Sequence, residues 1–197
     1  MFKLGSFTTL AIDNEEYDNI INTLKLGYKG KDGRVHRKNE RVATALATEF
    51  NLGIRVSDIV KLTLSDIVKD GSNHYRLDII EKKTGKPKTH LVNIPIYNYL
   101  KSYCEHNNIS PTARMFGITE REVQKQVKAV REFLGLDRVS THSFRKAAGN
   151  DIYESTGHNI VAVQEFYGHS STNTTQIYLK RSSSQLEKAL DDHVRLT

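Results

Sequence analysis

The sequence predicts a mainly helical protein with one small antiparallel β-sheet, an α+β fold. Three observations support this prediction. Most apolar side chains recur at the spacing of one helix face, residues 75–94 alternate instead, and only three prolines interrupt the 197-residue chain. A chain of this length can bury a full hydrophobic core, and no internal repeat divides it. One continuous domain is therefore expected.

Helices are expected where a capping residue precedes an apolar helical repeat. Asp13 is the first such residue, and the helix after it ends near Gly27. Its apolar face carries Tyr17, Ile20, Ile21 and Leu24. Further helices are expected over residues 38–50, 96–105, 119–134, 141–153 and 160–167, with shorter turns from Ser57 and from Ser65 or Asp66. A last helix is expected from Ser171 or Thr172 through Tyr178.

The alternating segment 75–94 predicts a β-hairpin. Its turn is Thr84-Gly85-Lys86-Pro87, and its apolar positions are Tyr75, Leu77, Ile79, Leu91, Val92 and Ile94. The stretch that contains Gly30 and Gly33 lacks such a pattern and is expected to be a loop.

The formal net charge of +6 makes a polyanion a reasonable partner. Basic side chains concentrate in and beside the loop that contains Gly30 and Gly33; they are Lys29, Lys31, Arg34, Arg37 and Lys38. These side chains could contact phosphates, or they could simply be solvated. The single cysteine, Cys104, excludes an internal disulfide and a cysteine-rich zinc site. No stretch approaches the roughly 20 apolar residues that span a bilayer. A cytoplasmic protein without a membrane anchor is the expectation.

Five short motifs follow one another in the sequence: Gly53-Ile54-Arg55-Val56-Ser57-Asp58, Lys83-Thr84-Gly85, His142-Ser143-Phe144-Arg145, Gly168-His169-Ser170 and Tyr178. Taken in order, this set resembles the active-site pattern of tyrosine site-specific recombinases, the family of phage integrases and Xer-type resolvases. The resemblance runs from about Asn14 to the C-terminal region. It implies the tyrosine recombinase catalytic-domain fold, with residues 1–183 as the catalytic domain. Recombinases of this family usually carry an N-terminal core-binding domain as well, and the expectation is that this sequence lacks it.

The resemblance also implies a role for each matched residue. Tyr178 would be the nucleophile, and it would form a 3′-phosphotyrosyl bond with DNA. Arg55 and Arg145 would bind the non-bridging phosphate oxygens, as planar guanidiniums do well, with Asp58 as a support for Arg55. His142 would take the phenolic proton, and His169 would orient the phosphate. No metal, ATP or cofactor is required.

The leaving 5′-oxygen needs a proton donor, and Lys83 matches the lysine that the family uses. Lys82 lies beside it. Because side chains alternate between the faces of a strand, only one of the two is expected to point inward, and Lys83 is favoured.

Double-stranded DNA is the expected partner, with a homotetramer on two DNA sites or a monomer in isolation. Residues 184–197 carry Leu186, Leu190 and Val194 four apart, a narrow stripe suited to docking on a neighbouring subunit or on its own domain. Two other functions are weighed against recombination: type IB topoisomerase-like relaxation of supercoils, and DNA binding without catalysis. Binding alone needs neither a nucleophile nor a general acid, which favours the recombinase.

Overall fold

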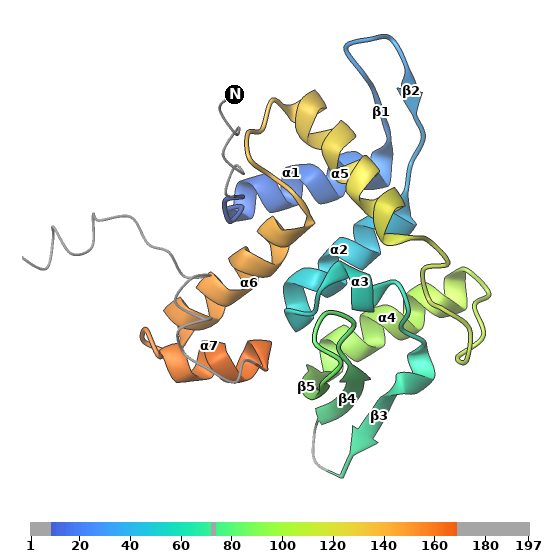
Figure 1. Cartoon of the computed structure of the whole chain (residues 1–197). Coiled ribbons are helices and arrows are strands. Elements are labelled where there is room, and N and C mark those ends of the chain that lie inside the picture. Colours follow the sequence, from blue (N-terminus) through green and yellow to red (C-terminus); the bar gives the residue numbers. More distant parts are fainter. Residues whose placement is uncertain (1–8, 72–73, 169–197) are drawn as a thin grey trace, which may run out of the picture.

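Seven α-helices and two small sheets make up the part of the chain that the computed structural model describes, residues 9–71 and 74–168 (Figure 1). The helices are α1 (Asn14–Leu26), α2 (Glu40–Leu52), α3 (Val56–Ile59), α4 (Ile94–His106), α5 (Glu120–Leu134), α6 (Thr141–Ser155) and α7 (Ile160–Tyr167), with one 3-10 turn, η1 (Leu64–Asp66). The predicted α+β fold class is confirmed.

Side-chain caps fix the start of several helices where the sequence predicts them. The Asp13 carboxylate accepts the Glu16 amide at 2.8 Å, and Thr119 Oγ1 accepts the Glu122 amide at 3.2 Å. Two short elements start elsewhere. Arg55 occupies the N-cap position of α3, so Ser57 lies inside this helix, and η1 begins after Thr63 because Thr63 and Asp66 form a capping box.

The larger sheet is antiparallel in the order β3 (Ile67–Asp70), β4 (His74–Ile80), β5 (Pro87–Asn93). Strands β4 and β5 are the predicted hairpin, with Leu77 opposite His90. Strand β3 was not expected because only Ile67 among its four residues is buried, which leaves no alternation to read. The predicted basic loop contains a short strand pair, β1 (Tyr28–Lys29) and β2 (Val35–His36).

Helix α2 lies in the middle of the fold (Figure 1). It contributes side chains to two hydrophobic clusters. Val42, Ala43 and Leu46 face a cluster built with α1, α5 and α6. Ala45 and Leu52 face a second cluster built with α4 and the β3–β5 sheet. Because α2 is held from both sides, the residues that follow it, Arg55 included, are fixed between the two halves of the core.

The expected helix up to Tyr178 and the apolar stripe in residues 184–197 lie outside the described residues. Among the described residues, no helix is long and apolar enough to cross a membrane.

Candidate active site

Arg55 is placed by the left-handed turn that ends α2. Gly53 adopts φ 59° and ψ 19°, and its amide donates to the Glu49 carbonyl at 2.9 Å. A Cβ at this position would lie 2.4 Å from the Phe166 ring, so the turn and the close approach of α7 both require glycine. The turn that leads from α2 to Arg55 is therefore packed directly against α7.

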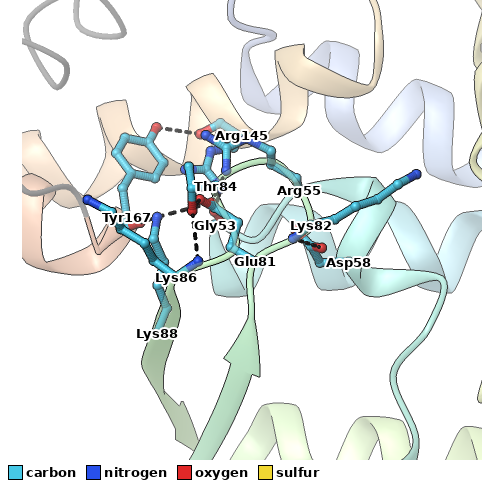
Figure 2. A network of polar contacts seen from close by, with 10 residues as sticks. All are labelled: Gly53, Arg55, Asp58, Glu81, Lys82, Thr84, Lys86, Lys88, Arg145 and Tyr167. Carbon is cyan, nitrogen blue, oxygen red and sulfur yellow. Dashed lines mark hydrogen bonds and ion pairs between the residues drawn. The ribbon is translucent and has the colours of Figure 1, made fainter.

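The Arg55 guanidinium forms an ion pair with Glu81 Oε1, at the end of β4 (Figure 2). The Lys88 ammonium lies 3.0 Å from the same oxygen, and Thr84 Oγ1 donates to Glu81 Oε2 at 2.7 Å. The Glu81 side chain is 3% exposed, whereas those of Arg55 and Lys88 are each 11% exposed. Burial strengthens such charge-assisted contacts, so Glu81 holds two cations in place.

Asp58 was expected to support Arg55, but its contact is with the hairpin. Asp58 Oδ1 accepts the Lys82 backbone amide at 2.9 Å, and the ion pair of Arg55 is with Glu81. The reason is geometric: Asp58 lies inside the short helix α3, beside the turn between β4 and β5. Asp58 therefore fixes the position of the turn that carries Lys82 and Lys83.

Arg145 lies on α6 and is only 1% exposed. Its Nη1 donates to the Gly53 carbonyl, and its guanidinium carbon lies 4.6 Å from the centre of the Tyr167 ring. Tyr167 Oη in turn donates to the Arg145 carbonyl at 2.6 Å. These contacts join α6, the end of α2 and α7 around one buried cation. Tyr167 is completely buried.

A cavity of about 430 Å³ opens beside Arg55. It is lined by Arg55, Val56, Ser57, Lys82, Lys83, Glu120 and His142. Partial burial and the charges of Arg145, Arg55 and Lys83 lower the pKa of His142. A neutral imidazole can accept a proton. The cavity thus brings together a guanidinium, a lysine and a proton acceptor from three distant segments, while Arg145 lies deeper and does not line it.

The expectation that only one of the two neighbouring lysines points inward is wrong. Lys82 and Lys83 both belong to the turn between β4 and β5 and not to a strand, so strand alternation does not apply, and both line the cavity. They differ in their partners. Lys82 Nζ lies 3.4 Å from Glu120 Oε2, whereas the charge of Lys83 acts on His142.

Glu81 and Lys88 were missed from the sequence, although strand alternation points to them. Leu77 and Ile79 lie on one face of the sheet, and Glu81, just after β4, follows the same alternation. Their partners in β5, His90 and Lys88, lie on the same face, as does Val92. Leu77 and Val92 are completely buried. The same parity therefore turns Glu81 and Lys88 toward the protein interior, where a charge requires a partner.

Two of the predicted site residues, His169 and Tyr178, lie outside the described residues. The basic residues of the β1–β2 hairpin are all exposed, and the hairpin projects beside α5, far from the β3–β5 sheet (Figure 1). They therefore do not belong to the cavity. The described part of the chain holds no group of three or more His, Cys, Asp or Glu side chains placed to bind a metal ion.

Curated relatives align with most of this chain. The SPbeta prophage-derived probable integrase/recombinase YopP of Bacillus subtilis (strain 168) is 28% identical over 144 residues, which is 71% of this chain and 39% of YopP. Tyrosine recombinase XerC of Caldanaerobacter subterraneus subsp. tengcongensis is 27% identical over 201 residues, which is 96% of this chain and 52% of XerC. The chain spans about half the length of such relatives or less.

Two solved structures share the fold. The XerH site-specific recombinase in a post-cleavage complex with a palindromic difH substrate matches with a TM-score of 0.69 at 22% identity, over 96% of this chain and 55% of XerH. A lambda integrase dimer bound to a COC' core site matches with a TM-score of 0.66 at 20% identity, over 88% of this chain and 60% of the integrase chain. The model of the phage integrase family matches residues 11–185. The chain belongs to the phage integrase family, which confirms the resemblance read from its motifs.

Proposed function

We propose that this chain carries the catalytic site of a tyrosine recombinase, which breaks and rejoins double-stranded DNA through a 3′-phosphotyrosyl bond to Tyr178. The observation that carries the proposal is the cavity that Arg55, Lys83 and His142 line together. These are three of the residue types that phosphodiester attack by a phenol requires: a cation for the phosphate, a proton donor and a proton acceptor.

In the cleavage step, Tyr178 Oη attacks the phosphorus, and the neutral imidazole of His142 accepts the phenolic proton. The bond between phosphorus and the 5′-oxygen breaks, and Lys83 donates a proton to that oxygen, which leaves as a 5′-hydroxyl. Arg55 binds the non-bridging oxygens, on which negative charge increases in the transition state. Rejoining is the reverse: a 5′-hydroxyl attacks the phosphotyrosyl bond and Tyr178 leaves.

Arg145, Asp58 and His169 complete the site. Arg145 adds a buried positive charge behind the cavity, and its contact with the Gly53 carbonyl holds the turn that leads to Arg55. Asp58 supports the turn that carries Lys83 through the Lys82 amide. His169 follows α7 after one residue and would donate a hydrogen bond to the phosphate.

The DNA and the assembly are part of the same proposal. XerH and lambda integrase, which share this fold, are solved bound to DNA. The exposed basic residues of the β1–β2 hairpin and of the two positions after it would contact phosphates away from the cleavage site; they are Lys29, Lys31, Arg34, Arg37 and Lys38. The corresponding expectations are a homotetramer on two DNA sites or a monomer in isolation, with residues 184–197 docked on a neighbour or on their own domain. The expected location is the cytoplasm, in a bacterial, phage or other mobile-element context.

Covalent capture tests the proposal without knowledge of the DNA site. The chain is incubated with duplexes that carry one nick beside a random tract, so that the cleaved 5′-hydroxyl fragment dissociates and the protein stays attached. We expect adducts that resist denaturation, whose sequences reveal the site. Tyr178→Phe should abolish them, whereas Tyr153→Phe should not. A chelator should have no effect. If no sequence gives an adduct, the chain is better explained as a DNA-binding module. If adducts form, and the chain relaxes supercoiled DNA but never joins two duplexes, it is better explained as a topoisomerase.

The two lysines of the turn are separated in the same assay. Lys83→Met should slow adduct formation by roughly 10²–10⁴-fold, the usual contribution of a general acid, and Lys82→Met by less. A bridging sulfur in place of the 5′-oxygen leaves without a proton, so this substrate should restore the rate of Lys83→Met. If it restores Lys82→Met instead, the two roles are exchanged.

A further inference from the structure

One carboxylate oxygen joins two cations, of which Arg55 lines the cavity. Glu81 Oε1 contacts both the Arg55 guanidinium and the Lys88 ammonium, the latter at 3.0 Å (Figure 2). We propose that Lys88 is a further phosphate-binding residue of this site, and that Glu81 keeps it beside Arg55 until a phosphate oxygen takes the place of the carboxylate oxygen. This inference rests on the proposed function, since it adds a residue to the same phosphate site.

The first argument is the geometry of the ammonium group. Among residues 9–71 and 74–168, Lys88 Nζ has two acceptors, Glu81 Oε1 at 3.0 Å and the Tyr167 carbonyl at 3.2 Å. An ammonium has three N–H donors, so these contacts leave one for a further acceptor. The Tyr167 contact also fixes the direction of the side chain, because it comes from the end of α7, an element distant in sequence from β5.

The second argument is the charge of the network. Arg55, Arg145 and Lys88 are the cations, and their mutual effect appears in the pKa of Lys88, which burial and then the two guanidiniums lower to about 8. Glu81, Asp58 and Glu49 are carboxylates near them. The lowered pKa of Lys88 shows that the positive charges are crowded in a largely buried place. A phosphodiester anion beside Arg55 and Lys88 would offset this repulsion, since buried charge is costly.

The third argument concerns the exchange of oxygens. A phosphate oxygen and a carboxylate oxygen accept the same kind of charge-assisted hydrogen bond. Since Glu81 Oε1 contacts both cations, an anion oxygen in its position would also contact both. Thr84 Oγ1 holds the other carboxylate oxygen at 2.7 Å, so Glu81 keeps one partner when Oε1 is displaced. The carboxylate therefore preorganises Arg55 and Lys88 and then competes with the phosphate for them.

The titration of Lys88 in the whole chain tests this inference, with inorganic phosphate as the probe. Lysine labelled with ¹³C at the ε position reports the charge on each Nζ by NMR, and Lys88→Met identifies the signal. Phosphate should raise the pKa of Lys88, because an added anion stabilises the ammonium, whereas chloride at equal ionic strength should not. The exposed Lys86 serves as the matched control, and Lys86→Met should leave phosphate affinity unchanged.

Substitutions distinguish phosphate binding from a structural ion pair. Lys88→Met should weaken phosphate binding about tenfold, and Lys88→Arg should restore most of it. Glu81→Gln keeps the shape and removes the competing charge, so it should tighten phosphate binding about tenfold. A Lys88 signal that ignores phosphate, or a Glu81→Gln variant that binds phosphate no better than the wild type, would overturn the inference.

Covalent capture on nicked DNA separates the inference from the proposed function. If Lys88 responds to phosphate but the wild type forms no adduct, the phosphate site stands and the recombinase chemistry fails. If adducts form at the same rate in the wild type and in Lys88→Met, the recombinase stands and the role of Lys88 fails. We expect a phosphate response in the wild type and slower adduct formation in Lys88→Met.

Discussion

Gly149→Ala should disturb the placement of Arg145 without touching a charged residue. A Cβ on Gly149 would lie 2.0 Å from Tyr167 Oη and 2.6 Å from the ring carbon that carries it. No side chain fits at these distances, so Tyr167 must move. Its hydroxyl would lose the 2.6 Å contact with the Arg145 carbonyl, and its ring would no longer lie under the Arg145 guanidinium.

The size of the effect follows from three contributions. Overpacking a tight interior contact costs about 1–3 kcal/mol, and the lost hydrogen bond costs about 1 kcal/mol. Alanine is a better helix former than glycine by about 1 kcal/mol, which offsets part of this. The expected loss is about 2 kcal/mol of unfolding free energy. For a chain of 197 residues, this corresponds to a fall of roughly 4–8 °C in Tm.

Urea denaturation measures this loss, and a double-mutant cycle assigns it to Tyr167. Tyr167→Phe removes the atom nearest to the added methyl group, so Gly149→Ala should cost less in that background than in the wild type. Adduct formation by the folded Gly149→Ala variant should also fall, because Arg145 is displaced. An equally stable variant with unchanged adduct formation would refute the idea that this contact places Arg145.

Three further predictions concern stability and are all checked by urea denaturation, the first two across a pH series. Burial, with the charges of Arg145 and Lys88, lowers the pKa of His90 to about 4. As the pH falls from 6.5 to 4, His90 therefore binds a proton in the unfolded chain but not in the native protein. Acidification through this range should lower the free energy of unfolding by up to about 3 kcal/mol. His90→Gln should make the free energy of unfolding depend less on pH in this range. Burial raises the pKa of Glu49 well above 4.5 despite the nearby Arg145, so the free energy of unfolding should decrease as the pH rises above 4.5. Glu49→Gln should remove this decrease. The same pH dependence in Glu49→Gln and in the wild type would contradict the prediction. Asp13→Ala should cost about 1 kcal/mol through loss of the α1 cap, and a change near zero would show that the cap is dispensable.

Much of the fold could be predicted because helix caps and apolar spacing act locally. Asp13, Thr119 and Asn159 begin helices where their side chains predict them. Strand β3 could not be predicted in this way, since its pairing with β4 depends on residues distant from its own sequence. The start of α3 was misplaced for a similar reason: Arg55 makes no side-chain cap, and the turn at Gly53 sets where the helix begins.

Site residues that belong to a motif could be predicted from the sequence. Site residues whose role depends on an ion-pair partner could not. Arg55, Lys83 and His142 were found by their motifs, and the structure brings them to one cavity. That Glu81 pairs with Arg55 could not be read from a motif, because the contact joins the end of a strand to a helix start 26 positions away in the sequence. Strand alternation predicts that the Glu81 side chain points inward, but which residue it pairs with depends on how the hairpin packs against α3.

The placement of the cations depends on close packing as well as on the ion pairs of Glu81. Arg55 and Arg145 repel each other in a buried place, so something else must hold them together. Gly53 supplies the carbonyl that Arg145 binds and the space that Phe166 enters, and Gly149 supplies the space beneath Tyr167. Helix α7 can therefore approach both arginines closely and bring the carbonyl that holds Lys88. Because Gly168 caps the end of α7, the packing that fixes the arginines also fixes the point in the fold after which the proposed site residues His169 and Tyr178 follow in the sequence.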